Sequence, residues 1–252
     1  METGAITQGV DVAQIVLYMF WAFFAGVIYY LLRENHREGY PLDNGQERGP
    51  VQIGWPVPDP KTYKLEDGRV ITIPDLNRPD GDHHFVPSHA WLGAPLEPVG
   101  DPLLSGMGPG AWAAREDICE KDPHGDLKIV PLRAAPKHGV AAQDHDPRGL
   151  SVYGADRLEA GTVVDLWVDR MEMMFRYIEV ALPSGKSVLL PVPFASISNR
   201  NIQVDSILST QFEKVPALKN SEQITRLEEE KICAFYGAGT LYATPERQEP
   251  LV

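Results

Sequence analysis

An uninterrupted apolar run near the N-terminus is the clearest pattern along the chain. From Val12 to Leu32 the only strongly polar residue is Gln14. About 21 residues at about 1.5 Å rise per residue give a helix of roughly 31 Å, which is long enough to cross the hydrocarbon core of a bilayer. The pattern therefore predicts a transmembrane helix over residues 12–32.

The two flanks of this run decide between a span and a cleaved signal peptide, and they set its orientation. Glu2 and Asp11 precede the run without any Lys or Arg, and no small-residue cleavage site precedes the charges that follow it, which disfavours a signal peptide. Arg33 and Arg37 come soon after the run, and basic flanks stay on the cytoplasmic side. We therefore expect residues 1–11 in the periplasm and the large soluble part in the cytoplasm.

Aromatic and basic residues mark the expected boundary between membrane and water. Tyr and Trp settle at such interfaces, and Lys and Arg are enriched just beyond them on the cytoplasmic side. We expect Tyr30, Arg33, Arg37 and Tyr40 to occupy this interface. The following residues are rich in Gly, Pro and polar side chains, and they predict a linker over residues 33–60.

The soluble part shows strand patterns. Two short apolar runs, 63–65 and 70–73, flank an Asp-Gly step, which predicts a β-hairpin at the start of an otherwise irregular cytoplasmic segment, residues 61–143. The pattern then tightens into a small antiparallel barrel or sandwich, within a domain over residues 144–252. The expected strands cover residues 163–168, 177–182, 188–191, 195–197 and 202–204, with a tight turn at 183–186.

A helix is expected at the end of this domain. Thr225 and Glu228 fit a capping box, so the helix should begin there and carry Ile232 on its apolar side. Gly237 and Gly239 should then weaken it. The predicted fold class is a membrane-anchored, mainly β protein with one N-terminal transmembrane helix, an irregular cytoplasmic segment, a small antiparallel barrel and a C-terminal helix.

Composition narrows the classes of partner. The chain of 252 residues carries 23 Lys and Arg against 35 Asp and Glu, for a formal net charge of −12. Nucleic-acid binding depends on cationic neutralisation of phosphates, so we expect no nucleic-acid partner. Cys119 and Cys233 are far apart in sequence and form no C-x-x-C pair, so we expect two reduced thiols, without a disulfide framework or a zinc site.

The segment from Asp122 to Asp126 is a candidate for proton chemistry. It places His124 between two carboxylates, and a histidine that titrates near neutral pH can accept a proton there and pass it on. Its Pro and Gly residues also indicate an ordinary polar surface turn. The residues alone favour the surface turn over the proton role.

A second polar cluster, Asp169, Glu172 and Arg176, surrounds a predicted strand connection, where a salt-bridged turn of little energetic weight is the alternative to a functional role. No metal site is expected. His83-His84 and His89 lie among Pro, Asp and Gly without a second ligand cluster at zinc spacing, so a solvated histidine loop is the favoured interpretation.

Several short blocks occur in order over nearly the whole chain. The first, RENHREGYPL at residues 33–42, follows the apolar run. The others are GP at 108–109, KIVPL at 128–132, DPRGL at 146–150, DLWVDR at 165–170 and YATP at 242–245. Together they resemble the H subunit of the purple-bacterial photosynthetic reaction centre, and the region from about residue 144 resembles the PRC-barrel module.

This resemblance implies an accessory, non-catalytic subunit of a light-driven electron-transfer complex in the bacterial inner (intracytoplasmic) membrane. Such a subunit caps the cytoplasmic face of the L and M chains, stabilises the complex, shields the quinones and conducts protons to the secondary quinone. It binds no cofactor by itself, and bacteriochlorophyll, bacteriopheophytin, quinones and non-haem iron belong to partner chains. Membrane lipids, a cytochrome subunit and a light-harvesting antenna ring are further candidate partners.

The resemblance also implies roles for individual residues. Proton entry matches the segment 122–126, where Asp126 stands at a position that is often a second histidine in the family. A carboxylate there weakens any soft-metal site. Glu172, with Asp169 and Arg176 beside it, matches the interface beneath the secondary quinone, where the group would form a partly buried relay.

Two other classes of protein compete with this interpretation. One is a PRC-barrel membrane adapter that binds another protein and moves no protons. The other is a tethered enzyme, which would need a pocket with a nucleophile and a base. The glycine-rich segment 106–110 lacks the strand-to-helix context and the Lys-Ser/Thr pair of a phosphate loop, so we expect a plain loop there.

Overall fold

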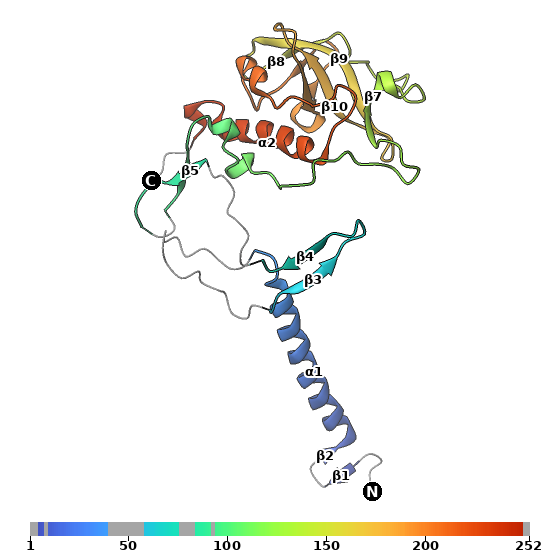
Figure 1. Cartoon of the computed structure of the whole chain (residues 1–252), viewed down its shortest axis with the longest axis vertical. Coiled ribbons are helices and arrows are strands. Elements are labelled where there is room, and N and C mark those ends of the chain that lie inside the picture. The colour runs from blue at the N-terminus through green and yellow to red at the C-terminus, as the bar shows by residue number, and fades with distance from the viewer. Residues whose placement is uncertain (1–4, 8–9, 40–57, 76–83, 92–93, 249–252) are drawn as a thin grey trace. The chain divides into compact units, whose positions relative to one another are not determined.

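The computed structural model describes residues 5–7, 10–39, 58–75, 84–91 and 94–248 (Figure 1). Contacts divide the chain into two compact units, and each is described by itself. The first comprises residues 1–81 with 89–95, and the second comprises residues 82–88 with 96–252. The expected interface residue Tyr40, most of the expected linker and His83 lie outside the described residues.

The first unit is built on helix α1 (Val12–Asn35), which confirms the predicted apolar helix and extends it by three residues. Asp11 caps it: its carboxylate accepts a hydrogen bond from the Gln14 backbone N–H at 2.7 Å, and the Gln14 side chain accepts one from the Asp11 N–H. No residue of α1 is buried, and its most apolar 18-residue window has a mean hydropathy of 2.1. In length and composition α1 is therefore a candidate membrane span.

A β-hairpin is attached to the C-terminal end of α1. Strands β3 (Lys61–Lys64) and β4 (Val70–Ile73) pair antiparallel around a turn in which Gly68 has a φ of +86°, as the Asp-Gly step predicts. Arg37 holds the hairpin by donating to the carbonyl oxygens of Asp59 at 2.7 Å and Ile73 at 3.3 Å. Because Asp59 lies just before β3 and Ile73 ends β4, one guanidinium joins the two chain segments at the open end of the hairpin to the helix end.

The second unit is a curled seven-stranded sheet in the order β11-β10-β9-β8-β13-β12, with β7 also paired to β9 (Figure 1). Every pairing is antiparallel except that of β8 with β13, so the predicted antiparallel barrel contains one parallel pair. Outside the sheet β5 (Phe85–Pro87) pairs with β6 (Leu96–Pro98). The sheet strands are β7 (Ile129–Pro131), β8 (Ser151–Tyr153), β9 (Glu159–Asp169), β10 (Met174–Ala181), β11 (Ser187–Pro191), β12 (Ser196–Ile197) and β13 (Asn201–Gln203).

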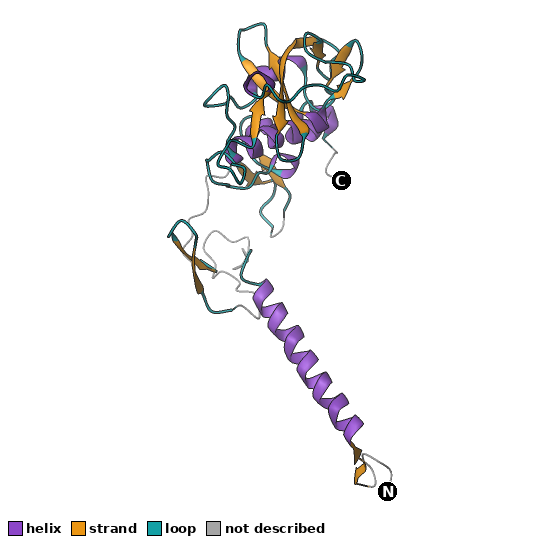
Figure 2. Cartoon of the chain, turned by 90° about the vertical axis from the view of Figure 1, so that its right-hand side faces the viewer, coloured by secondary structure: helices purple, strands orange, loops and turns teal. Residues whose placement is uncertain are grey.

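The sheet encloses the core of the unit. Leu166, Ile178 and Leu190 are cross-strand partners on three neighbouring strands and are buried together, because paired side chains of adjacent strands lie on the same face. The turn at 183–186 forms as predicted, with Gly185 at a φ of +88°. Long loops connect much of the rest of this unit (teal in Figure 2). Short 3₁₀ turns interrupt them at Pro102–Leu104, Gly108–Gly110, Leu132–Ala134, Val192–Phe194, Ser209–Lys214 and Pro245–Arg247.

Helix α2 (Arg226–Tyr242) packs its buried face into this core. Thr225 and Glu228 form the predicted capping box, with the Glu228 N–H donating to the Thr225 hydroxyl at 3.2 Å and the Thr225 N–H donating to the Glu228 carboxylate at 2.8 Å. Gly237 and Gly239, which were expected to weaken the helix, lie within it, since it continues to Tyr242. The glycines allow close packing: a Cβ on Gly237 would overlap the carbonyl oxygen of Pro109, and one on Gly239 that of Ser206.

The close approach at Gly239 predicts a stability effect. Gly239→Ala should lower the stability of the second unit by about 1–2 kcal/mol, because overpacking outweighs the better helix propensity of Ala. Thermal unfolding of the detergent-solubilised chain should then show a midpoint lower by roughly 2–8 °C. Gly139→Ala is the matched control, since nothing lies within 4 Å of its added Cβ. Equal midpoints for the two variants would contradict the packing account.

Candidate functional site

A buried carboxylate at the end of the central strand anchors the site. Asp169 is the last residue of β9 and has no exposed surface. One of its oxygens accepts hydrogen bonds from the backbone N–H groups of Met171 and Glu172, both at 3.0 Å. The other lies 3.5 Å from the Lys128 ammonium and 3.4 Å from the Arg176 guanidinium. Two cations from different elements therefore converge on one buried anion.

These contacts settle the charge of Asp169. Burial acts to raise its pKa, but the backbone N–H groups of Glu172 and Met171 and the charges of Lys128 and Arg176 outweigh burial and lower the pKa on balance. Asp169 is therefore a fixed negative charge at neutral pH. It positions the two cations.

Lys128 continues the cluster away from Asp169. Its ammonium donates to Glu120 at 3.0 Å, which raises the pKa of Lys128 and lowers that of Glu120. The other Glu120 oxygen lies 3.1 Å from the Arg226 guanidinium at the start of α2. A hollow lined in part by Cys119, Glu120 and Arg226 opens beside this end of the cluster. Solvent therefore reaches the acid–base cluster, defined as Glu120, Lys128, Asp169, Glu172 and Arg176, from that side.

Glu172 forms the outer end of the acid–base cluster. Its carboxylate lies 2.8 Å from Arg176 and 3.7 Å from Lys128, and its side chain is 48% exposed. The flanking residues Met171 and Met173 are exposed, and so is Met174 at the start of β10. A half-exposed carboxylate thus sits within an exposed apolar turn, and such patches commonly mark interaction surfaces.

A second acidic group, Glu229 in the first turn of α2, lies close to this cluster. The Tyr177 hydroxyl donates to its carboxylate at 2.9 Å, and the Cys233 sulfur is 4.0 Å from the same hydroxyl. Burial raises the pKa of Glu229; the hydrogen bond from Tyr177 opposes this, and the charge of Glu120 adds to it. Burial likewise raises the pKa of the Cys233 thiol. Glu229 is thus a carboxyl group of this region whose pKa is raised by burial.

The segment from Asp122 to Asp126 forms a polar turn, with Gly125 at a φ of +89°. One Asp122 oxygen accepts the backbone N–H groups of His124 and Asp126, both at 2.9 Å. Burial acts to raise the pKa of Asp122, but these N–H groups and the charge of Arg170 lower it on balance. The His124 side chain is exposed, as an entry point for protons requires.

The structure brings the two predicted clusters together. Arg170, which follows Asp169 in the chain, lies 3.6 Å from Asp122 and 3.9 Å from Asp126. Its backbone N–H also donates to the carbonyl oxygen of Lys128 at 2.9 Å. The polar turn and the acid–base cluster are therefore neighbours, although about 40 residues separate them in sequence.

Sequence reasoning missed three members of this region. Glu120 and Lys128 flank the polar turn but carry no motif of their own. Glu229 lies in the run Glu228 to Glu230 at the start of the predicted helix, where acidic side chains are ordinary because the helix dipole favours them. The spacing of Glu229 could have revealed its burial. It lies three residues before Ile232 and four before Cys233, so it shares the apolar face of the helix with them.

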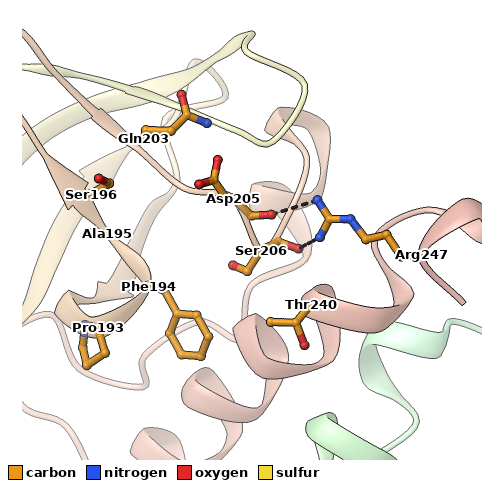
Figure 3. Close-up of a pocket in the computed structure, with 9 residues that line it drawn as sticks. All are labelled: Pro193, Phe194, Ala195, Ser196, Gln203, Asp205, Ser206, Thr240 and Arg247. Carbon is orange, nitrogen blue, oxygen red and sulfur yellow. Dashed lines mark hydrogen bonds between the residues drawn. The ribbon is translucent and has the colours of Figure 1, made fainter.

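Other candidate sites do not share this chemistry. A hollow at the C-terminal end of α2 is lined by Phe194, Ser206, Thr240 and Arg247 among others (Figure 3). Arg247 donates there to the carbonyl oxygens of Asp205, Ser206 and Gly239 at 2.7–2.8 Å, so it clamps the backbone. Within the described part of the chain no three His, Cys, Asp or Glu side chains gather as a metal site.

Comparison with known families agrees with this architecture. Residues 140–211 match the PRC-barrel domain, so the fold defines a PRC-barrel protein that carries a candidate membrane helix. Residues 4–134 match the N-terminal region of the photosynthetic reaction centre H-chain, over half of the chain. The chain belongs to the reaction centre H-chain family. The N-terminal match separates it from adapters that share the barrel alone.

The raised pKa of Glu229 predicts a pH-dependent stability difference. Since the unfolded chain loses this proton first, the stability that the protonated carboxyl contributes is fully present below its unfolded pKa, about 4.3, and is lost as pH rises through the folded pKa. Glu229→Gln should therefore gain stability relative to the native chain as pH rises from about 4 to about 8. Thermal unfolding across this range measures the difference.

Glu222→Gln serves as its control, because the Glu222 side chain is exposed. The account of Glu229 fails if the two variants follow the same pH dependence.

Proposed function

We propose that this chain caps the cytoplasmic face of the L and M chains of a photosynthetic reaction centre, shields their quinones and conducts protons to the secondary quinone. It acts as a non-catalytic subunit, and the pigments, quinones and non-haem iron belong to its partners. Family membership supports the assembly. The acid–base cluster supports the proton role, because it joins an exposed polar turn to a carboxylate in an apolar surface.

The observation that carries the proton role is the position of Glu172. Its carboxylate bridges Arg176 and Lys128, and both cations are held by the buried charge of Asp169. Docking of a partner chain on the exposed Met171 and Met173 would remove Glu172 from bulk water. A titratable group is then needed to deliver protons to that interface.

The route begins at the polar turn. Protons collect at an acidic surface and exchange with His124, which a carboxylate-rich turn holds at the surface. Arg170 and Lys128 connect this turn to the cluster. Water beside Glu120 carries protons inward, and Glu172 hands them to the partner. A carboxylate can do this because it is both acceptor and donor within one cycle.

Glu172→Gln tests the relay. The amide keeps the shape and part of the hydrogen bonding but cannot change protonation state, so the proton-coupled second electron transfer to the secondary quinone should slow by about 10²-fold to 10⁴-fold. The first electron transfer should stay largely unchanged. Flash-induced kinetics on assembled complexes measure both steps.

Glu159→Gln is the matched control, because Glu159 is an exposed glutamate at the opposite end of β9. Its second-transfer rate should equal that of the native complex. A native rate in the Glu172 variant from about pH 6 to about pH 9 would remove Glu172 from the pathway.

Orientation is a separate part of this proposal. Arg33 and Arg37 follow the apolar stretch of α1, so the large soluble part belongs on the cytoplasmic side. Protease added to sealed vesicles whose cytoplasmic face points outward should digest most of the chain beyond Arg37. Vesicles of the opposite orientation are the control and should protect it. The reverse pattern would overturn the orientation.

A further inference from the structure

The β3–β4 hairpin has an apolar face that takes no part in the proposed proton transfer. The register pairs Lys61 with Ile73 and Tyr63 with Ile71. Because side chains alternate along a strand and cross-strand partners share a face, these four residues form one face. The opposite face carries Thr62, Thr72, Lys64 and Val70. The hydroxyls of Thr62 and Thr72 lie 3.4 Å apart, as this assignment requires.

This hairpin buries little of its own surface. Both strands are exposed nearly throughout, and Tyr63 and Ile71 keep 39% and 38% of their surface exposed. An isolated two-stranded hairpin is marginally stable at best in water. Contact of its apolar face with another surface would therefore stabilise the hairpin.

The attachment to α1 fixes the depth of the hairpin. A helix of 24 residues measures about 36 Å, whereas the hydrocarbon core is about 30 Å thick, so the last turn of a spanning α1 reaches the headgroup region. Glu34 in that turn lies 3.1 Å from the Lys61 ammonium. Arg37, only 8% exposed, holds both ends of the hairpin one turn further on.

The same contacts orient the hairpin. Lys61 contacts Glu34, so the face that it shares with Tyr63 and Ile71 is the face turned to the last turn of α1, which is the side on which a spanning α1 enters the bilayer. That face combines a tyrosine, two isoleucines and a lysine. Such amphipathic surfaces bury apolar groups at the headgroup boundary while tyrosine hydroxyls and lysine ammonium groups stay among the phosphates.

We propose that the β3–β4 hairpin lies on the bilayer as a second, interfacial membrane contact, with Tyr63 and Ile71 inserted among phospholipid headgroups. The hairpin thereby sets the tilt and rotation of α1, which a single helix leaves free. This inference rests on α1 crossing the bilayer and is independent of proton transfer.

Nitroxide labels on the two faces test this contact in assembled complexes reconstituted into phospholipid nanodiscs. A label at Ile71→Cys should collide with oxygen, which dissolves in the bilayer, and be shielded from a water-soluble nickel complex. A label at Val70→Cys, on the opposite face, should meet the nickel complex freely. The ratio of oxygen to nickel accessibility should be about tenfold larger at position 71, since insertion of about 5 Å excludes the polar reagent.

The native complex, labelled in parallel, supplies the background from Cys119 and Cys233. Free access of nickel at position 71 would place the face in water, and shielding from both reagents would place it against a partner chain; either result overturns the inference. The second electron transfer is measured on the same complexes to separate this inference from the proposed function. A native transfer rate together with a water-exposed label at position 71 would overturn the hairpin contact and leave the proton role intact.

Discussion

The burial of the Asp169 charge is the constraint on which the rest of the site depends. A carboxylate without exposed surface is costly unless it is paired and hydrogen-bonded. Two backbone N–H groups, Lys128 and Arg176 meet that requirement, and they come from three neighbouring segments of the second unit. The same pairing holds Glu172 at the outer end of the cluster. One buried anion therefore positions both the cations and the half-exposed carboxylate of Glu172.

This arrangement divides two tasks between acidic side chains. Asp122 and Asp169 have lowered pKa values, so they remain charged and supply the field that holds cations in place. Glu229 has a raised pKa because it is buried beside Tyr177. Fixed charges and titratable groups thus lie within one network, which is what a proton conduit requires. In the proposed proton role, the negative net charge of the chain concentrates protons at the surface.

Prediction from sequence succeeded where local pattern determines structure. The N-terminal apolar helix, the Asp-Gly hairpin and the capping box at Thr225 depend on residues close together in the chain, and each formed as expected. Gly239 shows the limit: its low helix propensity predicted a weakened helix, but the absence of a side chain lets the helix approach the Ser206 carbonyl oxygen closely, and the helix continues to Tyr242. The surroundings of Glu229 and Lys128 come from strands far along the chain, so no local pattern could reveal their coupling.

Light-induced infrared difference spectroscopy tests the central claim most directly, because it detects carboxyl groups that change protonation when an electron reaches the secondary quinone. The account predicts a signal in the protonated-carboxyl stretching region that Glu172→Gln or Glu229→Gln removes or shifts. The control Glu159→Gln should leave that signal intact. Spectra that are identical in the native complex and in both cluster variants would contradict proton transfer through this site.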